Sequence, residues 1–361
     1  FRQLRWLMLS IVIVATMRLI HPKVYFDQAY RLYIALIVLL LLTYAMPAVS
    51  GGKRWLFLGP VRIQPSELGK IIMVMAIARY LTDYRKHLSK FQYAIVPLGM
   101  AALPALLIIG QPDLGTGIIY VAVVFVMMYW GGISHLHLFV ILAPVVSIIS
   151  GFNFYTFSLW MMTIILVLYF SRLKMEWKTV VFSGNAVFGT LAPVLWNSMQ
   201  PYQQRRIMTM LDATSDPQGA GYQVIQSRVA IGAGGIFGSG LGQGTQTHLR
   251  FLPESNTDFI IAVVGEELGF LAILFVLILF GWLFLRLLDR ATTTQYRFAS
   301  LTIIGFGTVL IVHTFINMGM AIGLMPVTGL PLPYLSYGGS FLLTCILIIG
   351  LTHYLLAGEP R

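Results

Sequence analysis

Charged residues are scarce in this chain, and their scarcity excludes most soluble architectures. Of the 361 residues, 10% are charged and 58% are hydrophobic, with a mean hydropathy of +0.81. Soluble domains average about 25% charged residues, so a soluble chain of this length could not keep so much apolar surface away from water. A lipid bilayer can solvate that surface instead. We therefore predict an integral membrane protein.

Cysteine and recognisable catalytic signatures are also nearly absent. The single cysteine, Cys345, lies in an apolar run, which excludes an internal disulfide and leaves the redox compartment open. The chain has no recognisable cleavable signal peptide, Walker lysine–serine pair, HExxH motif or Cys–His metal cluster. Lys and Arg number 24 against 13 acidic residues, a net charge of +11. With so few charges in total, this excess favours anionic lipid or an anionic substrate over nucleic acid.

Long apolar runs are what the chain does contain. A spanning helix needs about 20 mostly apolar residues. We predict eleven spans, near residues 5–20, 30–47, 66–82, 92–110, 114–131, 135–151, 155–171, 178–198, 258–285, 298–323 and 338–357. The predicted fold is therefore an all-α polytopic bundle of about 10–12 transmembrane helices, forming a single membrane domain over residues 1–361.

Basic residues between the spans indicate how the protein is oriented. The short segments on one side hold 13 Lys and Arg, and those opposite hold 6. The richer side is expected to be cytoplasmic. Residues 48–66, 199–257 and 324–337 then face outward, and 199–257 forms a large extracytoplasmic loop. Within it, residues 222–231 have the spacing of a short amphipathic helix, which could lie on the outer leaflet or pack on the protein itself.

Two segments rich in glycine or proline lie on this outward side. The glycine run 232–244 superficially matches a dinucleotide-binding loop, but neither the strand before it nor the βαβ unit that this motif requires is predicted. We interpret the run as a flexible turn. Residues 325–340 hold three prolines and three glycines, and this irregular segment is expected to line the outer cavity.

Asp258 is the acidic residue with the most suggestive position. It lies where the outward loop enters a long apolar helix. An acid there could simply stabilise the positive end of the helix dipole. Alternatively, a carboxylate at the membrane surface would be partly desolvated, which raises its pKa and suits a general base. The residues alone leave both interpretations open.

Glu266 and Glu267 lie deeper in the same predicted helix. Ionisable groups at such depth are costly and usually have partners inside the protein. Their predicted role is structural, with Arg18, Lys70 or His313 as the partner.

Other charged residues gather in the outward segments. Glu67 and Lys70 form an i,i+3 pair at a helix start, and Asp113 joins two spans, where it could cap a helix or face a cavity. The outward cations are Lys53, Arg54, Arg62, Arg205, Arg206, Arg228 and Arg250. Each alone would contact lipid headgroups, whereas together they could neutralise a phosphate or pyrophosphate.

Six short motifs follow one another in a characteristic order across residues 52–340. They are Gly52-Lys53-Arg54-Trp55-Leu56, Gln64-Pro65-Ser66-Glu67, Gln111-Pro112-Asp113-Leu114-Gly115-Thr116, Leu252-Pro253-Glu254 with Thr257-Asp258-Phe259, Gly265-Glu266-Glu267-Leu268-Gly269, and Pro331-Leu332-Pro333 with Ser336-Tyr337-Gly338-Gly339. The ordered set resembles the SEDS family (shape, elongation, division and sporulation proteins). Residues 216–223, 244–246 and 326–329 are similar to its rod-shape-determining branch, RodA.

The chain departs from the family pattern in two places. Family members usually have ten spans, and we expect the first of these to lie before Phe1. Between Gly132 and Tyr202, where the family has one helix, the sequence predicts three. Two added helices preserve the inside–outside parity, so the outward placement of residues 199–257 is unaffected.

The resemblance implies a peptidoglycan glycosyltransferase in the bacterial cytoplasmic (inner) membrane, with its active site on the extracytoplasmic side. Such enzymes polymerise lipid II, a disaccharide-pentapeptide on undecaprenyl pyrophosphate, into glycan strands, here during cell elongation. The family's catalytic aspartate falls on Asp258, which is expected to deprotonate the acceptor sugar. The candidates for binding the pyrophosphate or lining the cavity are Lys53, Arg54, Glu67, Lys70, Asp113, Arg205, Arg206, Arg250 and Glu254.

The resemblance also implies a protein partner, a class B penicillin-binding protein that cross-links the glycan. No motif demands a cofactor or metal, although the oxygens of Asp258 and Glu254 could hold a divalent cation. Two alternative functions are a flippase that carries lipid II across the membrane and a non-catalytic scaffold of the elongation machinery. A scaffold makes no demand on Asp258, so this residue separates it from the enzyme.

Overall fold

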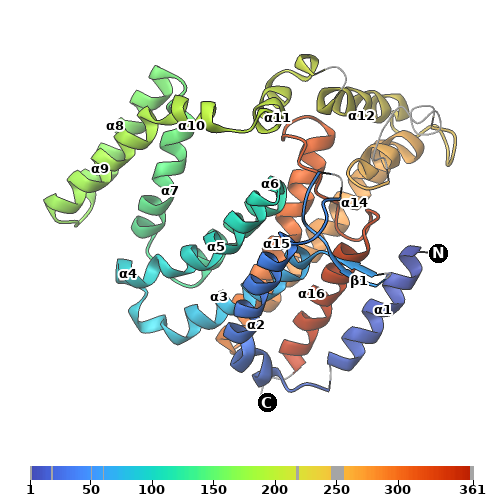
Figure 1. The fold of residues 1–361 in the computed structure, drawn as a ribbon, viewed down its shortest axis with the longest axis horizontal. Coiled ribbons are helices and arrows are strands. Elements are labelled where there is room, and N and C mark those ends of the chain that lie inside the picture. Colours follow the sequence, from blue (N-terminus) through green and yellow to red (C-terminus); the bar gives the residue numbers. More distant parts are fainter. Residues whose placement is uncertain are drawn as a thin grey trace.

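The computed structural model describes residues 2–17, 19–49, 51–59, 61–216, 219–244 and 256–357 (Figure 1). Arg18, Arg250 and Glu254, for which the sequence carries predictions, lie outside the described residues. The helices are α1 (Arg2–Met17), α2 (Pro22–Thr43), α3 (Pro65–Asp83), α4 (Phe91–Ala94), α5 (Val96–Gly110), α6 (Leu114–Trp130), α7 (His135–Ser150), α8 (Phe154–Phe170), α9 (Met175–Thr190), α10 (Ala192–Ser198), α11 (Pro201–Leu211), α12 (Ala220–Gly234), α14 (Ile260–Thr293), α15 (Arg297–Ala321) and α16 (Gly339–Ala357). Two 3-10 turns, η1 (Arg85–His87) and η2 (Ala213–Ser215), and an antiparallel hairpin of β1 (Leu56–Leu58) and β2 (Val61–Ile63) complete the described elements.

Each of the eleven predicted spans coincides with a helix or with two adjoining helices. Five of these, namely α2, α4 with α5, α14, α15 and α16, are long and apolar enough to cross a bilayer, and α9 with α10, bent by 48°, makes a sixth. The shorter apolar helices α1, α6, α7 and α8 and the more charged α3 account for the rest. The chain is a helical polytopic membrane protein, as the sequence predicted.

Helix ends differ from the predicted spans where polar residues continue a helix beyond its apolar part. The span predicted near 30–47 begins earlier, at Pro22 of α2. His21 caps this helix, because its side chain accepts a hydrogen bond from the Lys23 amide, and proline is favourable in a first turn. Hydropathy detects only the apolar stretch of such a helix and misses its polar first turns.

The centre of the bundle is formed by α15, which packs against α3, α6, α14 and α16. About 72% of the apolar window of α15 is buried inside the protein, against 11% for α14, so α15 is a core helix and α14 a peripheral one. Because α3 is also mostly buried, its charged residues near the helix start are held inside the bundle.

The helices α7, α8 and α9 pack on one another and stand to one side of the bundle, at the left of Figure 1. They are the three helices that the sequence predicted where the family has one. A polar network joins them: Ser147 Oγ donates to Asn185 Oδ1 at 2.7 Å, and Trp160 Nε1 donates to Ser147 Oγ at 2.9 Å. These hydrogen bonds satisfy polar groups that would be costly to leave unpaired in a bilayer.

The predicted short helix in the large loop is α12, and it packs on the protein itself. It lies along α14, and its Val224 and Ala230 side chains are buried. Ser227 Oγ donates to the Ala321 carbonyl at 2.7 Å, and Arg228 Nε donates to the Ile322 carbonyl at 2.9 Å. Of the two predicted alternatives, the structure therefore shows the second: α12 packs on the protein, attached to the end of α15.

The glycine run forms turns after the end of α12, as predicted, and its backbone is also bonded to a break in α14. Gly269 at this break has φ 81° and ψ −178°. The Phe270 amide donates to the Gly235 carbonyl at 2.9 Å, and the Ser239 amide donates to the Glu266 carbonyl at 2.9 Å. The glycines allow two backbones to approach closely, so that groups freed by the break are satisfied inside the protein.

Alanine at Gly234 is expected to destabilise the protein, whereas alanine at Gly232 in the same helix is not. A Cβ on Gly234 would lie 1.9 Å from the Gly265 carbonyl oxygen, and backbone cannot yield cheaply. A Cβ on Gly232 meets nothing within 4 Å. We expect Gly234→Ala to cost about 1–3 kcal/mol and Gly232→Ala to be neutral or stabilising by up to about 1 kcal/mol. Thermal unfolding in detergent measures both, and equal melting temperatures would contradict the close contact.

Candidate functional site

Four segments that carry charged residues and a fifth, uncharged segment meet at one end of the bundle. The segments are residues 51–67, 111–116, 201–216, 256–260 and 322–338. They include the starts of α3, α6 and α14 and the end of α15, together with α11. We call the residues Arg54, Asp113, Arg206 and Asp258 the charged cluster.

Arg54 is held against the segment that precedes α6. Its Nε donates to the Gln111 carbonyl at 3.0 Å, and its Nη2 donates to the Pro112 carbonyl. Its Nη1 lies 3.9 Å from Asp113 Oδ2. The Arg54 side chain is fixed by these contacts and remains 31% exposed.

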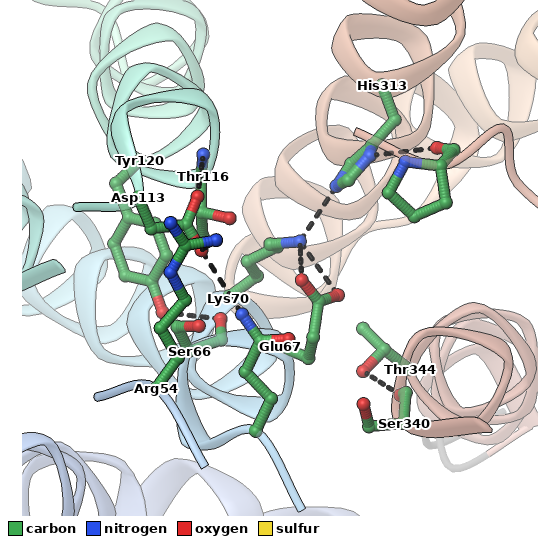
Figure 2. Close-up of polar contacts among 12 residues, drawn as sticks. Arg54, Ser66, Glu67, Lys70, Asp113, Thr116, Tyr120, His313, Ser340 and Thr344 are labelled. Atoms are coloured by element: carbon green, nitrogen blue, oxygen red, sulfur yellow. Dashed lines mark hydrogen bonds and ion pairs between the residues drawn. The ribbon is translucent and has the colours of Figure 1, made fainter. Parts of the chain in front are cut away.

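Asp113 caps α6, which decides between the alternatives that the sequence left open. Its Oδ1 accepts the Thr116 amide at 3.2 Å, and its Oδ2 accepts Gln64 Nε2 at 3.2 Å. The residue is only 6% exposed. The carboxylate is therefore an orienting group for Arg54, and Figure 2 shows the two side chains facing each other.

Arg206 interacts electrostatically with the other three members of the charged cluster. It extends from α11 with its guanidinium 5.8 Å from the centre of the Tyr202 ring. Burial lowers the pKa of Arg206 from its usual value. Smaller contributions come from Tyr202, Arg54, Asp113 and Asp258, in that order. Arg54 lowers this pKa further and the other three groups raise it, so Arg206 lies within electrostatic reach of the whole charged cluster.

Asp258 is half-buried where the chain enters α14. Asn317 of α15 donates through Nδ2 to the Asp258 carbonyl at 2.8 Å and to the Leu330 carbonyl at 2.7 Å. Gly329 has φ +73°, and a Cβ there would lie 3.4 Å from Asp258 Oδ2. The carboxyl group therefore lies beside residue 329, where an added Cβ would make ordinary contact with it and the positive φ would strain any other residue.

The segment 326–338 is irregular, as predicted, and is tied to the entrance of α14. Ser336 Oγ donates to the Thr257 carbonyl and accepts the Leu332 amide at 2.8 Å. The Tyr337 amide donates to the Asn256 carbonyl at 2.9 Å. These bonds satisfy backbone groups that a helix would otherwise pair, which allows irregular chain at this depth.

Glu67 and Lys70 form the predicted ion pair, and it is deeply buried (Figure 2). Lys70 Nζ lies 2.9 Å from each carboxylate oxygen of Glu67 and 2.8 Å from His313 Nε2. The exposed fractions of the two paired side chains are 0% for Lys70 and 5% for Glu67. The pair is thus bound within the protein core.

The remaining predicted residues are peripheral or lie outside the described part of the chain. Lys53 is exposed and donates to the Tyr44 carbonyl at 3.1 Å, and Arg205 is exposed on α11. Arg250 and Glu254 belong to residues 245–255, which the structure does not describe. Across the described ranges, no three His, Cys, Asp or Glu side chains are grouped to hold a metal ion.

Sequence reasoning missed two residues that shape the site. Asn317 binds both the Asp258 carbonyl and the 326–338 segment, and Tyr202 lies under Arg206. Asn317 did carry a signal, because a lone amide within an apolar span usually has a partner inside the protein. Tyr202 carried none, since aromatic residues are common throughout this chain.

The fold and the charged cluster together define a polytopic membrane protein with a charged site at one end of its helical bundle. The family model for FtsW, RodA and SpoVE, described as "Cell cycle protein", matches residues 1–158 and 136–357. This chain belongs to that family, which is the SEDS family that its motifs resemble. The two matches overlap over residues 136–158, which is where the additional helices begin.

Several curated relatives are similar over most of the chain. The "Peptidoglycan glycosyltransferase MrdB" of Escherichia coli K12 is 38% identical over 356 residues, covering 97% of this chain and 83% of the relative. The "Peptidoglycan glycosyltransferase RodA" of Treponema pallidum is 31% identical over 385 residues, covering 97% and 88%. "Stage V sporulation protein E" of Bacillus subtilis is 34% identical over 316 residues, covering 87% and 74%.

Solved structures share the fold. A chain from work described as "Structural coordination of polymerization and crosslinking by a peptidoglycan synthase complex" matches with a TM-score of 0.73 and 26% identity, covering 100% of this chain and 89% of that one. The rod shape determining protein RodA of Thermus thermophilus matches with a TM-score of 0.65 and 25% identity, covering 100% and 88%. These likenesses confirm the family predicted from the six motifs.

Proposed function

We propose that this protein is a peptidoglycan glycosyltransferase that polymerises lipid II into glycan strands during cell elongation, with Asp258 as the general base. The observation that carries the proposal is the charged cluster, in which two arginines approach two carboxylates at one end of the bundle. Support also comes from relatives at 31–38% identity that are named peptidoglycan glycosyltransferases.

The reaction asks two things of the protein. The acceptor's 4-hydroxyl is a weak nucleophile, so Asp258 takes its proton as the oxygen attacks the anomeric carbon of the donor. The bond from that carbon to the pyrophosphate oxygen then breaks, and the pyrophosphate lipid leaves with the electron pair. Arg54 and Arg206 stabilise the negative charge that grows on the leaving group. Asp113 orients Arg54 for this task.

We propose that the site faces the extracytoplasmic side of the bacterial inner membrane. The charged cluster involves the segments that the distribution of basic residues predicts to be outward, including α11 of the large loop. Lipid II presents its sugars at that surface, while its prenyl chain stays in the bilayer. We also propose a class B penicillin-binding protein as partner, since one similar structure comes from a complex that couples polymerisation to cross-linking.

The deciding experiment is polymerisation of purified lipid II by the protein with its partner present. Formation of long glycan strands, resolved on a gel and abolished when lipid II is omitted, supports the proposal. Transfer of labelled lipid II across liposome membranes without any polymer would instead support a flippase. If neither polymer nor transfer is detected while the partner still binds, the scaffold is the better description.

Two adjacent arginines on α11 give a matched test of pyrophosphate binding. Arg206 is half-buried and belongs to the charged cluster, whereas Arg205 is exposed. We expect Arg206→Ala to raise the KM for lipid II about tenfold or more, because a charge-assisted contact in a partly desolvated site is lost. Arg205→Ala is expected to change the KM less than about twofold. Steady-state kinetics compare the variants, and equal effects would remove Arg206 from the binding site.

A further inference from the structure

His313 is buried between two parts of the molecule that are distant in sequence. It lies on α15, with an exposed fraction of 0%. Its Nε2 is 2.8 Å from Lys70 Nζ on α3, and its Nδ1 is 3.3 Å from the Pro331 carbonyl oxygen in the 326–338 segment. Figure 2 shows the imidazole placed between these two contacts. The ring therefore bridges the Glu67–Lys70 pair to that segment.

The hydrogen-bonding chemistry of this bridge defines one arrangement of protons. An ammonium group has three donors and no acceptor. Two donors of Lys70 point at the two Glu67 oxygens, so the third reaches His313 Nε2, which must accept. A neutral imidazole that accepts at Nε2 carries its hydrogen on Nδ1. That hydrogen is donated to the Pro331 carbonyl, so each donor in this series of hydrogen bonds from Lys70 to Pro331 has an acceptor.

Two side chains on one face of α15 hydrogen-bond to two consecutive carbonyl groups of the 326–338 segment. His313 and Asn317 are one helical turn apart and therefore lie on one face of the helix. His313 binds the Pro331 carbonyl, and Asn317 binds the Leu330 carbonyl and the Asp258 carbonyl. Gly329, which lies against the Asp258 carboxyl group, is the next residue. The bridge thus ends at Pro331, two residues along the chain from Gly329, which lies beside the proposed general base Asp258.

We propose that His313 is a positioning residue that couples the buried Glu67–Lys70 pair to residues 329–331 and so fixes the backbone beside Asp258. This inference rests on the proposed function for its kinetic consequence, but its structural part stands alone. The ion pair is rigid because both partners are buried and share two short contacts. It anchors the imidazole from one side, and the imidazole holds the Pro331 carbonyl from the other.

A packing role without hydrogen bonding is the competing explanation, because the His313 ring also contacts the Phe341 ring at a centroid distance of 4.6 Å. Glutamine and methionine substitutions at position 313 distinguish the hydrogen-bonding role from the packing role, since these two side chains have similar length and shape. The carboxamide of glutamine can accept from Lys70 and donate to Pro331, whereas methionine can do neither effectively. Any difference between His313→Gln and His313→Met therefore reports the hydrogen bonds.

The test combines kinetics with hydrogen–deuterium exchange on the full chain and its partner. We expect His313→Met to lower kcat for lipid II polymerisation about tenfold, with KM changed less than about twofold, and to speed amide exchange in residues 329–337. His313→Gln is expected to stay within about threefold of the parent kcat. Thr314→Val is the control, because among the described residues Thr314 Oγ1 bonds within α15, to the Leu310 carbonyl, and it should leave exchange in 329–337 unchanged.

The outcomes separate this inference from the proposed function. Equal kcat and equal exchange for the Gln and Met variants would overturn the role of His313. If the parent protein makes no glycan, the proposed function fails, while the exchange comparison still decides whether the bridge holds residues 329–331. Exchange in α7 to α9, which pack apart from the bridge, verifies that each variant is folded.

Discussion

Replacing Asp258 with asparagine is expected to lower glycan polymerisation from lipid II by about 10²–10⁴-fold. Asparagine has nearly the same shape but cannot take a proton from the acceptor hydroxyl. The Asp258 contact with Asn317 uses the backbone carbonyl, so the substitution leaves that tie in place. The rate of strand formation by the purified complex, at saturating lipid II, measures the effect.

The matched control for this variant is Asp289→Asn. Asp289 lies on the same helix, α14, but near its other end, where it is exposed. We expect Asp289→Asn to polymerise at the parent rate, and both variants to keep the parent melting temperature and to bind the partner. Normal polymerisation by Asp258→Asn would show that another group is the base. Equal loss in both variants would point to a general loss of protein quality instead of a catalytic defect.

Replacing Lys70 with methionine is expected to cost about 3–5 kcal/mol of stability. The substitution leaves the Glu67 carboxylate buried and unpaired, and it also removes the hydrogen-bond donor to His313 Nε2. Exposed fractions of 0% and 5% for the two side chains mean that water cannot replace the lost partner. Thermal or denaturant unfolding in detergent, with tryptophan fluorescence as the signal, measures the change.

A double variant and a second ion pair provide the controls. Adding Glu67→Gln to Lys70→Met removes the uncompensated charge, so we expect part of the lost stability to return. Asp83→Asn disrupts the Arg79–Asp83 pair, which lies on the same helix but has exposed fractions of 21% and 34%, and should cost at most about 1 kcal/mol. If Lys70→Met proves no more harmful than Asp83→Asn, the Glu67–Lys70 pair contributes little to stability.

Local patterns predicted the helices well because a helix and a bilayer impose constraints that act over neighbouring residues. All eleven predicted spans coincide with helices, and the three predicted between Gly132 and Tyr202 are α7, α8 and α9 with α10. The errors lie where polar residues extend a helix, as at Pro22. The glycine run 232–244 is a turn as predicted, but its contact with the break at Gly269 depends on a distant segment and was not predicted.

The residues of the candidate site were harder to rank from sequence. Arg205 and Arg206 are equivalent in composition and position along the chain, and only the orientation of α11 separates them. Asp113 could have been a cap or a cavity residue, and its bond to the Thr116 amide made it a cap. The identification of Asp258 as the base came from the family resemblance and stays a proposal that the asparagine variant tests.

The sequence by itself determined that the protein lives in a membrane, where its helices run and to which family it belongs. These properties depend on apolar runs and short motifs, which are local and therefore readable along the chain. Only the tertiary structure decided which charges meet. Lys70 and His313 are 243 residues apart in sequence, and Arg206 on α11 interacts electrostatically with Asp113 and Asp258 from other segments. Such encounters depend on how distant helices pack against one another, and no local pattern records that packing.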